Sequence, residues 1–245
     1  MKKYVTGFVM AILAGVSIAV GGAVYLAAEN KVVGAVFFSV GLFTVCTKQL
    51  NLFTGKAVYL FDNKPKFLID LVIIWAGNFV GAWAVAALLS LTRQAERLGE
   101  AASTLAQTKT YDSLLSLFIL GVFCNVCIYF AVYSYGKNAH ELGKYVGIVF
   151  GVTAFILAGF EHSVADMFYF AVAGRLLEGR ALLCLLVVTL GNVVGGVLFP
   201  LGIKLKEYLT ESKKIGRILR NVKRRCGFSA VFYHFLLLSL VRPAM

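Results

Sequence analysis

Charged residues are scarce in this chain of 245 residues: only 15% are Asp, Glu, Lys or Arg, whereas 60% are hydrophobic. A soluble domain carries about 25% charged residues, so the composition excludes an ordinary soluble protein and indicates an integral membrane protein. Acidic residues are the scarcest, because 12 Asp and Glu stand against 24 Lys and Arg, which gives a net charge of +12.

Cysteine and histidine are also few. The five cysteines are an odd number and four of them fall in apolar runs, which excludes a disulfide framework. Cys124 and Cys127 have the spacing of a redox pair, but they lie in an apolar stretch and are predicted to be small packing residues. Neither a His-Glu-x-x-His set nor a Gly-x-Ser-x-Gly turn occurs. We therefore expect no enzyme activity, no metal and no cofactor.

Six apolar runs approach or exceed the roughly 20 residues that cross a bilayer. Polar residues interrupt two of them, the second at residues 48–56 and the fifth at Glu161, His162, Ser163 and Asp166. Ionisable side chains inside a membrane face a protein interior or a water path, and freed backbone lines a cavity. The two breaks predict a transport site between two repeats; two re-entrant segments without a passage are the alternative. The six spans are expected at about 4–28, 32–61, 67–91, 113–135, 146–174 and 181–203.

Each half of the chain has a plain span, a broken span and a span with Gly-Asn-x-x-Gly, at Gly77–Gly81 and Gly191–Gly195. Three spans per half insert the second half upside down relative to the first. Asn78 and Asn192 then hold equivalent places, and we predict that each amide bonds the freed backbone of a broken span. The predicted fold is an all-α integral membrane bundle of inverted three-span repeats with broken second and fifth helices.

The distribution of Lys and Arg predicts the orientation. Lys2, Lys3, the loops 62–66 and 137–144 and the basic tail fall on one side, which the positive-inside rule assigns to the cytoplasm. We expect a multi-pass protein of the inner (plasma) membrane with both termini cytoplasmic. Residues 1–205 form the predicted six-span transport domain. Residues 206–245 form a basic cytoplasmic tail with an apolar segment at 226–241, which is expected near anionic lipid and not on nucleic acid.

These motifs resemble those of the formate/nitrite transporter family over about residues 4–205. The Phe-Glu-His-Ser element in the broken fifth span is specific, and the match rests on Ala14–Val16, Leu52–Gly55, Gly77–Gly81, Cys124–Asn125, Gly159–Phe168 and Gly191–Gly196. The resemblance implies an aquaporin-like six-span fold and a homopentamer with a pore through each subunit.

The resemblance also implies roles for single residues. His162 and Thr54 face each other at the centre of the pore, Lys109 lies in the outer vestibule, and Asn125 supports the centre. Two apolar constrictions involve Leu42, Leu52 and Phe155, with Phe38 nearby. The sequence departs from the family pattern at Asn51, where an acidic residue is usual, and it has no clear counterpart of the family's inner-vestibule lysine. Lys48 and Lys56, which flank the first break, are candidates to replace that charge.

The expected function is passage of a small monovalent weak-acid anion, namely formate, nitrite, lactate or hydrosulfide. A bare anion loses its hydration in an apolar constriction at high cost, so we expect it to cross as the neutral acid. Lys109 would attract the anion, and His162 would exchange a proton or only donate a hydrogen bond. Glu161 and Asp166 are predicted to brace the broken backbone outside the pore. The alternatives are an aquaporin-like pore for neutral solutes, although paired Asn-Pro-Ala motifs are absent, and a membrane-embedded enzyme.

Overall fold

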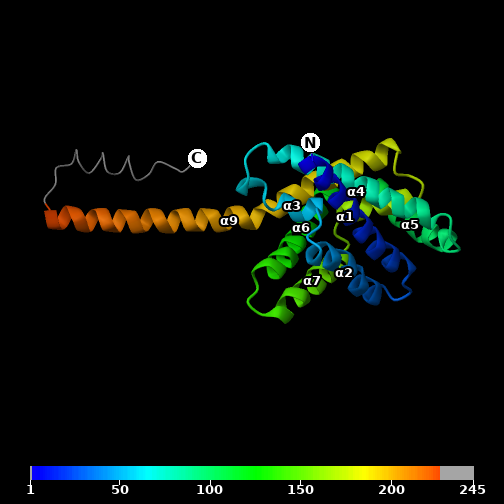
Figure 1. The fold of residues 1–245 in the computed structure, drawn as a ribbon, viewed down its shortest axis with the longest axis horizontal. Coiled ribbons are helices and arrows are strands. Elements are labelled where there is room, and N and C mark those ends of the chain that lie inside the picture. Colours follow the sequence, from blue (N-terminus) through cyan, green and yellow to red (C-terminus); the bar gives the residue numbers. More distant parts are fainter. Residues whose placement is uncertain (1, 227–245) are drawn as a thin grey trace. The chain divides into compact units, whose positions relative to one another are not determined.

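The computed structural model describes residues 2–226 and is helical, without strands, over that range (Figure 1). It divides into two compact units, one ending at Phe199 and one beginning at Pro200. The predicted apolar segment at 226–241 lies outside the described residues except for Cys226. The helices are α1 (Lys2–Ala27), α2 (Lys31–Thr47), α3 (Phe53–Ala57), η1 (Leu60–Asp62), α4 (Phe67–Leu89), α5 (Ala95–Tyr111), α6 (Leu114–Lys137), α7 (Glu141–Leu157), α8 (Ser163–Val172) and α9 (Gly179–Cys226).

The predicted spans map onto these helices. α1, α4, α6 and the Gly179–Lys214 part of α9 are long and apolar enough to cross a membrane. The second span is broken into α2 and α3, and the fifth into α7 and α8. Both breaks contain a left-handed residue, Gln49 with φ 53° and Gly159 with φ 68°, which ends the preceding helix.

One segment differs from the expectation. The expected spans included no helix between residues 91 and 113, but helix α5 occupies most of this stretch. Its sequence is polar on average and apolar on one face only, where Leu98, Ala102 and Ala106 are buried. A helix that lies over the end of a bundle needs no continuous apolar run, so the hydropathy of the stretch did not reveal it.

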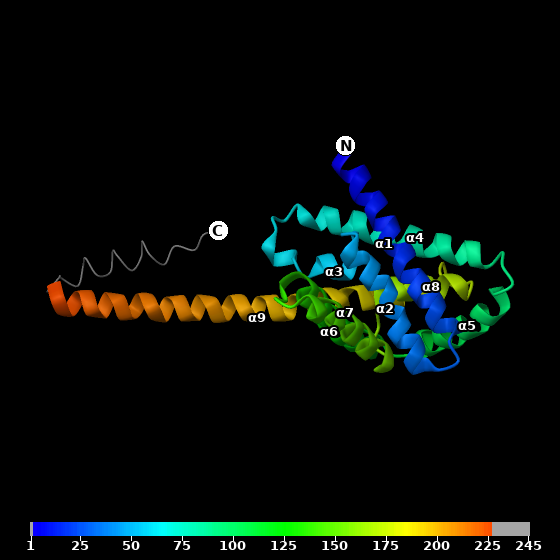
Figure 2. The ribbon, with the colours of Figure 1, turned by 60° about the horizontal axis from the view of Figure 1, so that its bottom comes forward.

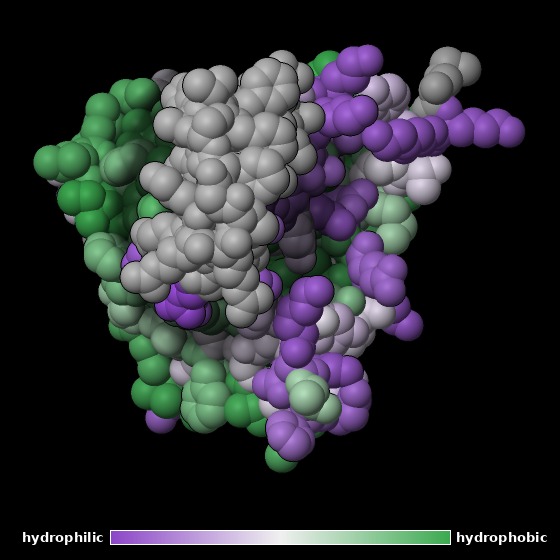
Figure 3. All heavy atoms as spheres, turned by 90° about the vertical axis from the view of Figure 1, so that its left-hand side faces the viewer, coloured by the Kyte–Doolittle hydropathy of each residue, from purple (hydrophilic) through white to green (hydrophobic). Residues whose placement is uncertain are grey.

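The helices pack in an arrangement that repeats between the halves. α1 lies along α2 and α4, and α6 lies along α7 (Figures 1 and 2). Glycine permits the closest approaches: a Cβ on Gly15 would lie 2.3 Å from the Asn78 carbonyl oxygen, and one on Gly195 would lie 2.0 Å from that of Val122. Small residues at such crossings are typical of membrane helices. On the face shown in Figure 3, hydrophobic side chains gather over one side, as expected for a surface that meets lipid.

Candidate functional site

The two breaks, residues 48–52 and 158–162, are built in the same way. In the first break, the backbone N–H of Asn51 donates to the carbonyl oxygen of Met10 at 3.3 Å. In the second break, the N–H of Glu161 donates to the carbonyl oxygen of Leu120, also at 3.3 Å. Asn51 and Glu161 are therefore structural counterparts, one in each half of the chain.

Asn78 of α4 satisfies the freed backbone of the first break. Its Oδ1 accepts from the N–H of Phe53 at 2.8 Å. Its Nδ2 donates to the carbonyl oxygens of Ala11 at 2.7 Å and Asn51 at 2.9 Å. The side chain is fully buried, so these three bonds supply partners that water cannot provide there.

Asn192 of α9 does the same for the second break. Its Oδ1 accepts from the N–H of Ser163 at 3.0 Å, and its Nδ2 donates to the carbonyl oxygens of Gly121 at 2.8 Å and Glu161 at 2.9 Å. The geometry supports the predicted equivalence of Asn78 and Asn192 and the predicted bond from each amide to a broken span.

The centre of the site joins the two halves. Thr54, in the first turn of α3, and His162, directly before α8, lie with Thr54 Oγ1 and His162 Nε2 2.9 Å apart. The N–H of Ala165 donates to His162 Nδ1 at 3.1 Å. A backbone N–H only donates, so Nδ1 carries a lone pair and the proton of the neutral ring sits on Nε2. Nε2 therefore donates to Thr54, and the hydroxyl hydrogen of Thr54 remains available for another oxygen.

Aromatic and aliphatic side chains surround this pair. The Phe155 ring stacks on the His162 ring with centroids 5.5 Å apart and planes at 19°, and Phe38 meets Phe155 edge-on at 6.0 Å. Leu42 and Leu52 belong to the same buried core. The structure thus brings Phe38 and Phe155 together with His162 and buries all four residues predicted for the constrictions.

Asn125 of α6 ties the centre to its surroundings. Its Nδ2 donates to the carbonyl oxygen of Thr54 at 3.2 Å and to that of Asn192 at 2.5 Å. Its Oδ1 is buried and has no hydrogen-bond partner among the described residues. This geometry agrees with the predicted supporting role.

Lys109 has closer partners than the sequence indicated. It lies near the end of α5 and is buried, and its Nζ forms ion pairs with Glu161 and with Asp166, the latter at 2.9 Å. Burial by itself lowers the pKa of Lys109, but the carboxylates of Asp166 and Glu161 outweigh it and raise the pKa above its usual value. Lys109 is therefore a charged cation held in two ion pairs. Glu161 and Asp166 were expected only to brace the broken backbone, but they also pair with Lys109. One signal was available: lone ionisable residues within a membrane bundle pair with one another.

Two cavities lie near the two ends of α1. A cavity of about 140 Å³, the Lys109 cavity, is lined among others by Tyr25, Lys109, Glu161 and Tyr169. Tyr25 stands near the end of α1, so this cavity and a second one near the start of the helix are about 30 Å apart along its axis.

The second cavity, of about 460 Å³, is the Lys56 cavity. It is lined among others by Lys3, Asn51, Lys56 and Asp70. Lys3 Nζ lies 3.1 Å from Asp70, whereas Lys56 has no ion pair or hydrogen bond through its side chain within residues 2–226. Lys48 is exposed and does not line this cavity. Of the two lysines that flank the first break, Lys56 therefore lines this cavity and Lys48 does not.

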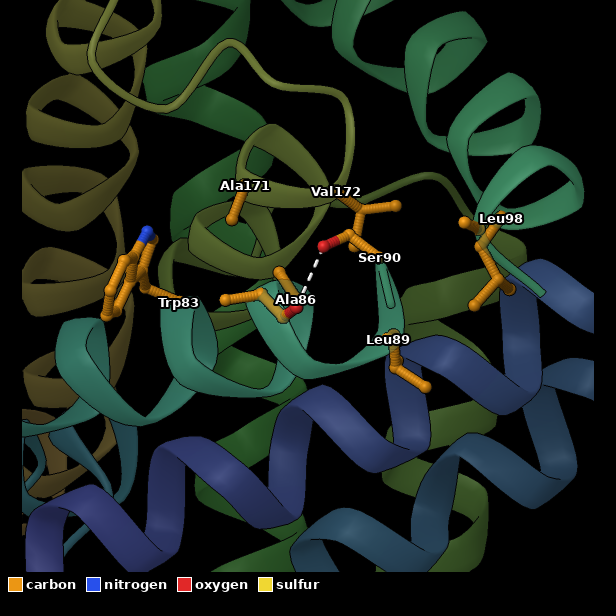
Figure 4. Close-up of a pocket in the computed structure, with 9 residues that line it drawn as sticks. Trp83, Ala86, Leu89, Ser90, Leu98, Ala171 and Val172 are labelled. Atoms are coloured by element: carbon orange, nitrogen blue, oxygen red, sulfur yellow. Dashed lines mark hydrogen bonds between the residues drawn. The ribbon is translucent and has the colours of Figure 1, made fainter. Parts of the chain in front are cut away.

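A third hollow, of about 110 Å³, lies between the ends of α4, α5 and α8 (Figure 4). Trp83, Leu89, Leu98 and Val172 line it, and the Ser90 hydroxyl donates to the Ala87 carbonyl oxygen within its wall. It contains none of the predicted site residues and offers no charged group. We therefore place the functional site at the central pair and the two cavities that contain lysine.

Comparisons with known proteins identify the family of this chain. The model of the family described as formate/nitrite transporter matches residues 2–205. A probable formate transporter of Methanothermobacter thermautotrophicus is 32% identical in a match that covers 83% of this chain and 89% of the relative. The nitrite transporter NirC of Escherichia coli is 31% identical over 69% of this chain and 68% of its own. A solved pentameric formate channel with formate bound superposes with a TM-score of 0.75 at 26% identity, covering 85% of this chain and 98% of that chain.

Proposed function

Because the chain belongs to the formate/nitrite transporter family of membrane transport proteins, we propose that it carries a small monovalent weak-acid anion across the membrane as the neutral acid. The candidates are formate, nitrite, lactate and hydrosulfide. The observation that carries the proposal is the buried Thr54–His162 pair, which lies among apolar side chains and is flanked in sequence by residues of both cavities.

The proposed path follows the two breaks. Asn51 lines the Lys56 cavity and precedes Leu52, while Glu161 lines the Lys109 cavity and precedes His162. A permeant that enters from the Lys56 cavity meets the apolar Leu52 before it reaches Thr54. An acid at the centre can accept a hydrogen bond from the Thr54 hydroxyl, and this bond offsets part of the hydration that the acid has lost.

The permeant anion needs a proton to become the neutral acid. The hydrogen bonds of His162 favour the solvent in the cavities, and not His162, as the source of this proton. The neutral ring has its only N–H on Nε2, and a second proton on Nδ1 would break the bond from Ala165. The permeant is therefore protonated before it reaches His162, where the falling dielectric favours its neutral form. His162 acts as a hydrogen-bond donor in the resting pore.

The assembly and orientation complete the proposal. The similar solved channel is pentameric, and we propose a homopentamer in the lipid bilayer for this chain. We place it in the inner (plasma) membrane with both termini cytoplasmic, which assigns the Lys56 cavity, lined by Lys3, to the cytoplasmic side.

Uptake into proteoliposomes tests the function. Formate, nitrite, lactate and hydrosulfide are compared at two external pH values, with His162→Ala beside the unchanged protein. Flux of one or two anions that rises on acidification supports passage as the neutral acid. Electrogenic flux without pH dependence would show an ordinary anion channel. Flux of neutral solutes alone would support the aquaporin-like alternative. The observation in favour of that alternative is that Lys109 is paired with the two carboxylates of Glu161 and Asp166.

A further inference from the structure

Helix α9 is longer than a membrane span requires. It has 48 residues from Gly179 to Cys226, whereas a bilayer needs about 20, and the family match ends at residue 205. We call residues 201–226 the helical extension. Every side chain described there, at positions 201–214 and at Arg217, is exposed. The extension therefore leaves its own surface available to something outside this chain.

The extension carries an apolar stripe. Leu201, Leu205, Tyr208 and Leu209 are 40%, 58%, 61% and 50% exposed. Their spacing of three and four residues places them on one face of a helix. Ser212 takes the next place on this face, and the sequence then continues the face with Ile215, Leu219 and Val222. Packing of an amphipathic face supplies most of the stability of a helix, so an exposed apolar stripe on this helix calls for a partner.

The opposite face is basic. Lys206, Lys213, Lys214 and Arg217 lie on that face. Over the whole extension nine Lys and Arg stand against two Glu, which gives a net charge of +7. A basic face opposite an apolar stripe is typical of helices that lie in the plane of a bilayer surface.

We propose that the helical extension lies on an anionic bilayer surface, with its apolar stripe among the acyl chains and its Lys and Arg side chains at the headgroups. The span that precedes it uses about 20 residues from Ala181 to Pro200 to cross the bilayer, so the extension begins at the membrane boundary. Pro200 lacks the N–H that would bond residue 196, which weakens the helix at that boundary and lets its axis turn.

A second copy of the chain is the competing partner, because the same spacing also fits a coiled coil. In that arrangement several extensions would lie side by side, each with a net charge of +7 after Glu207 and Glu211 are counted, and they would repel one another. Anionic headgroups instead attract each Lys and Arg near the surface. Charge complementarity therefore favours the bilayer, and this inference does not rest on which substrate the pore carries.

Hydrogen exchange of the full chain tests the proposal in two kinds of nanodisc, one of phosphatidylcholine alone and one that also contains phosphatidylglycerol. Two variants provide the matched comparison. Leu205→Glu places a charge on the apolar stripe, whereas Ile203→Glu adds the same charge on the opposite side of the helix, roughly 160° away. Amide exchange is followed by mass spectrometry across residues 201–214.

We expect exchange in residues 201–214 to slow several-fold in the anionic nanodiscs relative to the zwitterionic ones, and to return to fast exchange in high salt. Leu205→Glu abolishes the slowing, and Ile203→Glu retains it. Equal slowing in both nanodiscs and in detergent, lost with Leu205→Glu, would overturn the proposal in favour of contact between copies. Fast exchange in both nanodiscs, or slowing that both variants retain, would overturn insertion of the stripe.

Discussion

At the scale of single residues, the hydrogen bonds of His162 set the direction of donation at the centre of the proposed pore. The backbone of α8 bonds Nδ1, Nε2–H points to Thr54, and the Thr54 hydroxyl hydrogen is left over. The two side chains come from opposite halves of the chain, so the inverted repeat creates a polar pair that neither half contains by itself.

The hydroxyl of Thr54 is therefore the group to remove first. Thr54→Val keeps the shape of the side chain but leaves the buried Nε2–H without an acceptor and the permeant without a donor. An unmade buried hydrogen bond costs about 1–3 kcal/mol, so we expect acid uptake into proteoliposomes to fall by about tenfold. Thr54→Ser retains the hydroxyl and should stay near the unchanged rate. Equal uptake by the two variants would contradict a role for the hydroxyl.

Lys109 poses a different question, because its pairing makes structural and functional roles hard to separate. Lys109→Met leaves Glu161 and Asp166 as buried carboxylates without a cation, and breaking a buried ion pair costs about 3–5 kcal/mol. We expect a lower unfolding temperature and little uptake. The raised pKa of Lys109 keeps it protonated through neutral and mildly alkaline pH, so its titration does not produce a rise in uptake on acidification.

A triple variant separates the two roles. Lys109→Met combined with Glu161→Gln and Asp166→Asn removes all three charges, and we expect the unfolding temperature to recover while anion uptake stays low. The readouts are thermal unfolding in detergent and uptake in proteoliposomes. Recovery of both stability and uptake would show that Lys109 serves only to neutralise the two carboxylates.

At the scale of elements, the stability of the broken spans depends on two asparagines with matching bonds. Asn78→Leu and Asn192→Leu each leave one N–H and one carbonyl oxygen of a break without their side-chain partner, at about 1–3 kcal/mol per group. We expect both variants to lose the folded oligomer in size-exclusion chromatography, to a similar extent. Asn63→Leu is the matched control, because the exposed Asn63 makes one bond, to the Tyr59 carbonyl oxygen. A folded oligomer of either buried variant would contradict the proposed role.

The sequence predicted those elements that are defined locally. Polar residues inside apolar runs located both breaks, and Gly-Asn-x-x-Gly located Asn78 and Asn192. The partners of Lys109 could not be predicted in this way, because α5 is polar on average and its contact with α8 joins residues 57 positions apart, from Lys109 to Asp166. Hydropathy likewise ended the last span near Ile203, whereas α9 continues to Cys226 because amphipathic spacing replaces the continuous apolar run.

At the scale of the whole molecule, the two cavities that contain lysine differ in charge. The Lys109 cavity holds one lysine close to two carboxylates, whereas the Lys56 cavity holds Lys56 and a Lys3–Asp70 pair. The counterpart of Glu161 in the Lys56 cavity is the neutral Asn51. The two breaks therefore share the same backbone arrangement but differ in the charges beside them. The Lys56 cavity is the more positive of the two.

This difference predicts that Lys56 attracts the anion on its side of the membrane. Lys56→Met removes the only lysine of that cavity without an ion pair among the described residues, so we expect the apparent KM for anion entering from that side to rise several-fold. Lys48→Met removes an exposed lysine at the other end of the same break, outside the cavity lining, and should leave KM unchanged. Stopped-flow uptake at low and high ionic strength measures the KM of both variants. The rise in KM caused by Lys56→Met should be smaller in high salt, because salt screens the attraction between the lysine and the anion. Equal effects of the two substitutions would instead assign them to the net charge of the protein surface.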